Sequence, residues 1–242
     1  MMVSGTRPST ETMSPFLRLT LASSLAALFV TSAWTASEFS PAEQALFVTD
    51  QISRLRPPTT LHYRFEKSGS LEAGFDDKVA IALTAQPDGK CCAAAAEFLS
   101  GPRRLALPEI ESAQGNPAIM YFLERDIREM ERRTKGKSNY FRKRIRMAIF
   151  QGATIADVML PYRGASVKAQ QITIAPYLDD PLRARFEQLA TKRYIFTLSD
   201  AVPGGVLSIR TQVDGAGAGT PPLLAEEMSL VNANAGSAPR QP

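Results

Sequence analysis

The sequence has few of the residues that metal and disulfide chemistry need: two cysteines and one histidine among 242 residues. Structural zinc, iron–sulfur clusters and disulfide frameworks each require several such residues, so the composition argues against all three. The excess of positive charge is small as well, because 28 Lys and Arg face 24 Asp and Glu. A net charge of +4 is typical of a mildly basic surface rather than of a protein that wraps nucleic acid. We therefore expect no metal, no cofactor and no nucleic-acid partner.

The longest uncharged segment near the N-terminus is short and follows a basic residue. Residues 19–30 are apolar or small, Arg18 precedes them, and residues 31–36 are mostly small. This order is typical of a signal peptide, and the run is shorter than the about 20 apolar residues that span a bilayer. We predict a signal peptide over residues 1–36, with cleavage after Ala33 or Ala36 and export to the periplasm. A retained N-terminal anchor helix is the alternative.

Composition also sets the domain boundaries. Residues 37–213 are long enough for one domain with a sizeable core, and they contain no visible internal repeat. Residues 214–242 are rich in Gly, Ala, Pro and Asn, a composition that buries too little apolar area to offset the entropy of ordering. The sequence therefore predicts a single α+β domain over 37–213 and a disordered tail over 214–242.

Alternating polarity predicts antiparallel strands on both sides of a helical hairpin. In residues 61–66 every second residue is apolar, which is typical of a strand with one buried face. Similar patterns predict strands over 71–83, 90–99 and 103–107, joined as a four-strand meander, and further strands over 154–160, 167–174, 194–198 and 206–213. Apolar residues at helical spacing follow Asn116-Pro117 and Ser138, and a third helix is predicted from Asp180-Pro181. The fold class is then α+β: a curled, open-barrel-like antiparallel β-sheet covered by a helical hairpin and one further helix.

Eight cations gather within fifteen residues around the turn of that helical hairpin. They are Arg132, Arg133, Lys135, Lys137, Arg142, Lys143, Arg144 and Arg146. One interpretation is a patch for an anionic partner, either a membrane surface or an envelope protein. The other is a solvated helix end whose charges complement nearby acids.

Apolar side chains recur on one face of the predicted strands. They are Tyr63, Phe65, Phe75, Ile81, Phe98, Ile172, Ile174 and Phe196. A curled sheet lined in this way and covered by helices can hold a lipid or an acyl chain. The same face can also be an ordinary core filled by helix side chains.

The remaining polar motifs do not assemble a catalytic site. His62 falls on the polar face of a strand without a Gly-x-Ser-x-Gly elbow elsewhere, and the pairs Asp76-Asp77 and Asp179-Asp180 lie where turns and helix caps favour aspartate. Cys91 and Cys92 allow a strained ring, an intermolecular bridge or free thiols, and buried free thiols need no strain. We expect a protein that is not an enzyme.

The exported meander, its helical cover and the apolar sheet face together resemble the periplasmic lipoprotein-carrier superfamily of LolA and LolB type. The resemblance is one of architecture over residues 59–213, and it implies an open barrel with a helical lid that holds acyl chains. Residues 116–130 and 140–146 also resemble an uncharacterised bacterial envelope family. The expected function is an exported, non-enzymatic carrier of a lipid or lipoprotein acyl chain. The alternative is an envelope assembly factor that docks an anionic partner through residues 132–146.

Overall fold

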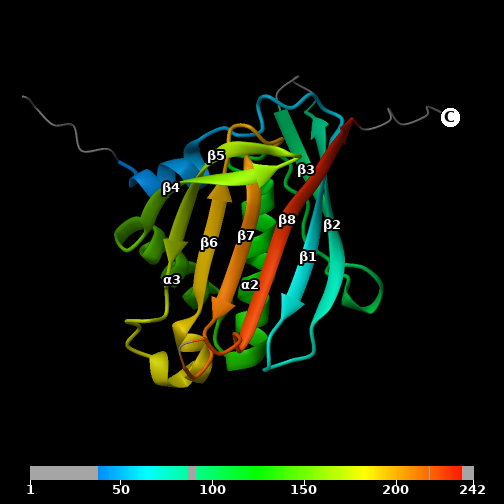
Figure 1. Ribbon diagram of the computed structural model, residues 1–242. Coiled ribbons are helices and arrows are strands. Elements are labelled where there is room, and N and C mark those ends of the chain that lie inside the picture. The colour runs from blue at the N-terminus through cyan, green and yellow to red at the C-terminus, as the bar shows by residue number, and fades with distance from the viewer. Residues whose placement is uncertain (1–37, 87–90, 218, 236–242) are drawn as a thin grey trace, which may run out of the picture. The chain divides into compact units, whose positions relative to one another are not determined.

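The computed structural model describes residues 38–86, 91–217 and 219–235, all of which belong to the unit that begins at Ser37. The predicted signal peptide lies outside the described residues. Eight antiparallel strands form one open sheet in the order β3-β2-β1-β8-β7-β6-β5-β4 (Figure 1). The strands are β1 (Thr59–Ser68), β2 (Phe75–Ala85), β3 (Cys91–Phe98), β4 (Thr154–Tyr162), β5 (Ala165–Ile174), β6 (Arg193–Leu198), β7 (Val206–Val213) and β8 (Leu224–Ala235).

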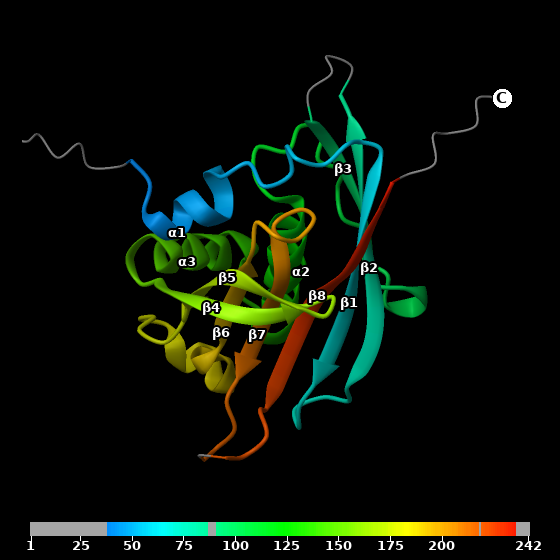
Figure 2. The same ribbon diagram turned by 45° about the horizontal axis from the view of Figure 1, so that its top comes forward.

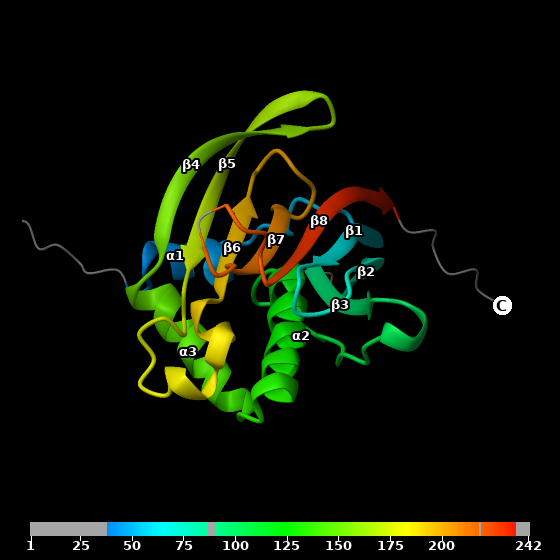
Figure 3. The same ribbon diagram turned by 60° about the horizontal axis from the view of Figure 1, so that its bottom comes forward.

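Two long helices, α2 (Pro117–Thr134) and α3 (Ser138–Gln151), cover one face of the sheet (Figure 3). The β4–β5 hairpin bends away from the helices on the other side of the sheet (Figure 3). This arrangement confirms the predicted α+β class, the curled open sheet and the helical hairpin. The helix-covered face is the inner face of the sheet, and it contains the core.

The start of α2 follows from its first two residues. The Asn116 side chain accepts a hydrogen bond from the Ala118 amide at 3.0 Å, and Pro117 occupies the first helical position, where a missing N–H costs nothing. The Asn116 amide group also donates to the Gly204 carbonyl at 2.7 Å, which ties this helix end to the β6–β7 turn. The helix ends at Lys135, whose φ of 56° places it in the left-handed region.

The predicted disordered tail is wrong for residues 224–235, because they form β8. This strand pairs with β1 on one side and with β7 on the other, so it joins the N-terminal and C-terminal halves of the sheet. Leu224, Met228 and Leu230 point into the core, and Glu226 shares their alternating phase. The buried glutamate interrupts the apolar pattern, and this is why composition alone predicted a tail. The predicted domain end at 213 is wrong for the same reason.

Two further elements differ from prediction. Residues 103–107 are not a fourth strand: a 3₁₀ turn, η2 (Gly101–Arg103), precedes a single bridge between Leu105 and Phe98, and Pro102 cannot donate to a ladder. The helix predicted from Asp180 is instead two 3₁₀ segments, η3 (Arg183–Arg185) and η4 (Glu187–Thr191). Glu187 has a φ of 51°, which a continuous right-handed helix does not allow.

A short helical segment at the N-terminal side was not predicted. It consists of α1 (Pro41–Glu43) and a π-helical turn, η1 (Gln44–Val48), and a capping box between Ser40 and Glu43 begins it. The segment lies beside the C-terminal end of α3, where the Ser40 hydroxyl donates to the Ile149 carbonyl at 3.4 Å (Figure 2).

Candidate functional site

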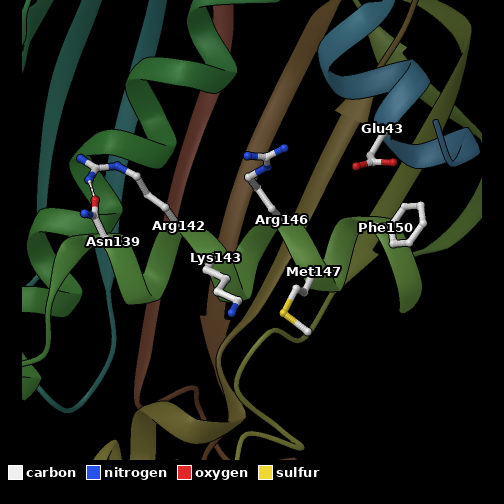
Figure 4. Close-up of a pocket in the computed structure, with 7 residues that line it drawn as sticks. All are labelled: Glu43, Asn139, Arg142, Lys143, Arg146, Met147 and Phe150. Carbon is white, nitrogen blue, oxygen red and sulfur yellow. Dashed lines mark hydrogen bonds between the residues drawn. The ribbon is translucent and has the colours of Figure 1, made fainter. Parts of the chain in front are cut away.

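The outer face of α3 combines cations with exposed apolar side chains. Its residues follow helical spacing i, i+3, i+4, i+7, i+8 and i+11, so they form one strip along the helix. We call this set the α3 strip: Asn139, Arg142, Lys143, Arg146, Met147 and Phe150. Together with Glu43 of α1 these side chains line a pocket of about 410 Å³ (Figure 4). The Phe150 side chain is 53% exposed, which is unusual for a phenylalanine and leaves its ring available to a partner.

The helix folds in this way because its opposite side is strongly apolar. Phe141, Ile145 and Ile149 are almost completely buried against the rest of the core, as the sequence pattern predicted. Ser138 is the first helical residue, and the capping position belongs to Lys137, which forms no side-chain cap.

Within the described residues, four of the eight cations of the predicted patch form ion pairs and four do not. Arg132 and Arg133 form ion pairs with Glu129 and Glu72, and these charges are largely neutralised where they lie. Arg142 pairs with Glu124 at 2.8 Å, and Arg144 pairs with Asp180 at 2.6 Å. Across the described ranges the other four have no carboxylate oxygen within 4.0 Å, and all four are exposed: Lys135, Lys137, Lys143 and Arg146.

The structure also brings the predicted apolar face together. Seven of its eight side chains are buried in one core, and the eighth, Phe75, is partly buried and packs against that core. Ile119, Phe122 and Ile127 of α2 belong to the same cluster, so helix side chains occupy the space over the sheet. Five pockets on the described residues are lined by other side chains.

A buried polar row crosses the inner face of the sheet, and sequence reasoning missed it. In register from strand to strand it consists of Lys67, Glu226, Thr211 and Tyr194. Arg125 of α2 donates to both carboxylate oxygens of Glu226, at 2.6 and 2.8 Å, and the Lys67 ammonium lies 3.5 Å from the same carboxylate. Burial is the largest single influence and raises the pKa of Glu226, but the charge of Arg125, the charges of Lys192 and Lys67 and the hydrogen bonds from Arg125 together outweigh it and lower the pKa below its ordinary value. Glu226 is therefore a buried anion.

The row continues through a second buried ion pair. Asp126 of α2 pairs with the Lys192 ammonium and accepts a hydrogen bond from the Tyr194 hydroxyl at 2.6 Å. Tyr177 and Tyr194 share a hydrogen bond of 3.1 Å. Burial, and next the charge of Asp126, raise the pKa of Tyr194 well above its ordinary value, so it remains a donor. The sequence contains one signal for this row, because Arg125 and Asp126 are adjacent residues of opposite charge within the apolar part of α2.

The polar motifs singled out in the sequence have structural partners. Asp76 pairs with Arg64 at 2.9 Å, and Asp77 accepts hydrogen bonds from Ser100. His62 lies on the outer face of β1, opposite Ala80 and Asn232 of the neighbouring strands. No group of three or more potential metal ligands of the His, Cys, Asp or Glu type occurs in the described segments.

Cys91 and Cys92 form a disulfide with each other, so the interpretation as buried free thiols is wrong. The bond lies at the start of the edge strand β3.

None of the described helices combines the length and the apolar composition that crossing a bilayer requires.

Fold and site together define an α+β protein with an open antiparallel sheet, a filled inner face and a cationic, partly apolar outer helix. No family model and no curated protein matches the chain. The crystal structure of the Mycobacterium tuberculosis lipoprotein LppX covers 81% of this chain and 91% of its own, with 10% identity and a TM-score of 0.33. A crystal structure of a LolA superfamily protein from Nitrosomonas europaea covers 82% of this chain and 94% of its own, with 8% identity and a TM-score of 0.23. These identities and TM-scores assign neither a family nor a function to this chain.

Proposed function

We propose that the protein is an exported, non-enzymatic lipid-binding protein of the cell envelope that docks on anionic lipid through the α3 strip. The observation that carries the proposal is the position of Lys143 and Arg146, two exposed cations that form no ion pair within the described residues, on the same helix face as exposed Phe150. Cations beside an aromatic ring are the arrangement with which peripheral helices bind a headgroup layer. Export rests on residues 1–36, and we propose the periplasm as the compartment.

Charge complementarity favours a lipid surface as the occupant of this face. Each Lys or Arg close to an anionic bilayer contributes about 1 kcal/mol, and an aromatic ring adds burial at the boundary between headgroups and acyl chains. Within the described residues the only carboxylate that lines the α3 pocket belongs to Glu43. The net field over the strip is therefore positive.

The test is co-sedimentation of the mature protein with vesicles of mixed phosphatidylglycerol and phosphatidylcholine. Replacing two cations, Lys143→Gln with Arg146→Gln, is expected to weaken binding by about thirtyfold, the equivalent of about 2 kcal/mol. The matched control Arg56→Gln with Lys78→Gln removes the same charge from exposed sites away from α3 and is expected to bind normally. Phe150→Ser is expected to weaken binding without changing its dependence on salt.

Two results contradict the proposal. One is wild-type protein that does not sediment with anionic vesicles at low salt. The other is a Gln variant at positions 143 and 146 that binds as tightly as its control. If the wild-type protein instead retains an envelope protein, and the Gln variant at positions 143 and 146 does not, the α3 strip is the docking face of an assembly factor.

A second candidate function is that of an acyl-chain carrier. The observation in its favour is that one inner face of an open sheet gathers seven buried apolar side chains under a helical hairpin. In the present packing α2 fills that face, and buried ion pairs join α2 to Glu226 of β8 and to Lys192, the residue before β6. A carrier function therefore requires α2 to leave its position.

Native mass spectrometry with lipid extraction tests the carrier function. The mature protein is purified from the periplasm of its own host, and a stoichiometric mass excess that extracts as lipid supports a carrier. A bare mass from gently prepared material contradicts it and leaves docking through the α3 strip as the function.

A further inference from the structure

A second pocket, of about 220 Å³, opens between the α2–α3 turn and the loop around η3. Three of the residues that line it are cations, Lys135, Lys137 and Arg185. Its apolar lining comes from Tyr140, Phe141, Leu182 and Phe186. Lys143 and Arg146 of the α3 strip do not line it, so it is a separate site.

Asp180 fixes the two sides of this pocket to each other. Its buried carboxylate accepts hydrogen bonds from the Tyr140 hydroxyl at 2.6 Å and from the Leu182 amide at 2.7 Å. Arg144 of α3 lies 2.6 Å from the same carboxylate and balances its charge. The loop that places Leu182 and Arg185 is therefore attached to α3, and Arg144 neutralises the carboxylate that attaches it.

The apolar side of the pocket is rigid because it belongs to an aromatic cluster. The ring of Phe186 lies 5.8 Å from that of Phe141, 5.6 Å from that of Tyr177 and 6.2 Å from that of Tyr140, measured between centroids. Gly136 is required at the turn, because a Cβ there would lie 2.5 Å from Cζ of Phe141. The pocket is thus a preformed space with fixed rings on one side.

The charge in this pocket is unbalanced. No carboxylate lines it, and for Lys135, Lys137 and Arg185 no carboxylate oxygen lies within 4.0 Å in the part of the chain that the structure describes. Lys135 also adopts a left-handed backbone with φ of 56°, a conformation that is uncommon for a residue other than glycine. Like charges held together without an anion repel one another, so a bound anion would relieve this repulsion.

We propose that this pocket binds the phosphate group of an amphipathic phosphate ester. The three cations hold the phosphate oxygens, and the carbons next to the phosphate pack against Leu182 and Phe186. A lipid headgroup and free inorganic phosphate both supply this group, and the experiment separates them. The inference goes beyond docking of the α3 strip, because it concerns one discrete ligand and different side chains.

Isothermal titration calorimetry of the mature protein tests the proposal with soluble probes. Dihexanoyl phosphatidic acid, below its micelle concentration, is compared with inorganic phosphate and with dihexanoyl phosphatidylcholine, whose choline cation the pocket repels. The pocket variant is Lys135→Gln with Arg185→Gln. The control variant, Lys78→Gln with Arg183→Gln, removes equal charge and includes a neighbour of Arg185 that does not line the pocket. Thermal unfolding of each variant confirms that it folds.

We expect saturable binding of dihexanoyl phosphatidic acid with one site, weakened at least about tenfold in the pocket variant and unchanged in the control. Weaker binding of inorganic phosphate identifies a lipid headgroup as the ligand, whereas equally tight binding identifies free phosphate. Absence of binding by both phosphate probes, equal loss in both variants, or preference for phosphatidylcholine overturns the proposal. Vesicle docking through Lys143 and Arg146 is measured separately, so either proposal can fail alone.

Discussion

Replacing Glu226 with glutamine tests how strongly the buried polar row attaches α2 to the sheet. The side chain of Glu226 is fully buried, and Arg125 contacts both of its oxygens. Glutamine has nearly the same shape, so the change removes charge without opening a cavity. Arg125 and Lys67, both buried, would then face a neutral amide in place of an anion.

The expected cost follows from the uncompensated charge. Removing one partner of a buried ion pair lowers the free energy of unfolding by about 3–5 kcal/mol. This loss is large, because the free energy of unfolding of a whole domain is only about 5–15 kcal/mol. The control is Glu227→Gln on the neighbouring residue of β8, which points to the outer face and is half-buried. This change is expected to alter the free energy of unfolding by less than about 0.5 kcal/mol.

Guanidinium unfolding as a function of pH provides the measurement. The pKa of Glu226 in the folded state lies below the ordinary value of 4.5, so its contribution is complete above that pH and is lost as the pH falls toward about 2. The difference between wild type and Glu226→Gln should therefore be largest at neutral pH and should shrink in acid. A difference below about 1 kcal/mol at pH 7 would refute the reasoning.

Three further changes test the fold and the pockets. Truncation after residue 223 removes β8 from between β1 and β7, and we expect near-UV circular dichroism to show loss of the cooperative unfolding transition. Asp180→Asn leaves Arg144 without its carboxylate and should lower the free energy of unfolding by about 1–3 kcal/mol in urea titrations. Phe196→Ala should cost about 3–5 kcal/mol if the inner face is a filled core, and a much smaller loss would indicate a ligand cavity there.

Much of the fold was predictable where one signal dominated. The alternation of Leu61, Tyr63 and Phe65 predicted a strand whose buried face the structure confirms, because strand side chains alternate between faces. Asn116 and Pro117 predicted the start of α2 for an equally local reason, since cap and first-turn chemistry depend on adjacent residues.

Prediction failed where a residue depends on a distant partner. Glu226 counts as polar in any pattern, yet it is buried because Arg125, 101 residues earlier, binds it. The same applies to the cationic patch, because sequence alone could not tell that Arg132 and Arg133 pair with Glu72 while Lys143 and Arg146 stay exposed. Only the cations of the α3 strip were therefore predicted, as part of a larger basic region, and Met147 and Phe150 were not.

The distribution of ion pairs explains why the two helices of the hairpin differ in role. Arg125 and Asp126 of α2 point inward to buried opposite charges, and the outer Arg128 pairs with Glu124 of the same helix. Charges paired in this way contribute little to the field outside the protein, because each cation lies against an anion. Within the described residues of the hairpin, the exposed cations without such partners, Lys135, Lys137, Lys143 and Arg146, belong to α3 and to the turn before it. An anionic surface that approaches the hairpin therefore meets α3 first, and the phosphate pocket at its N-terminal end lies within one helix length of the strip.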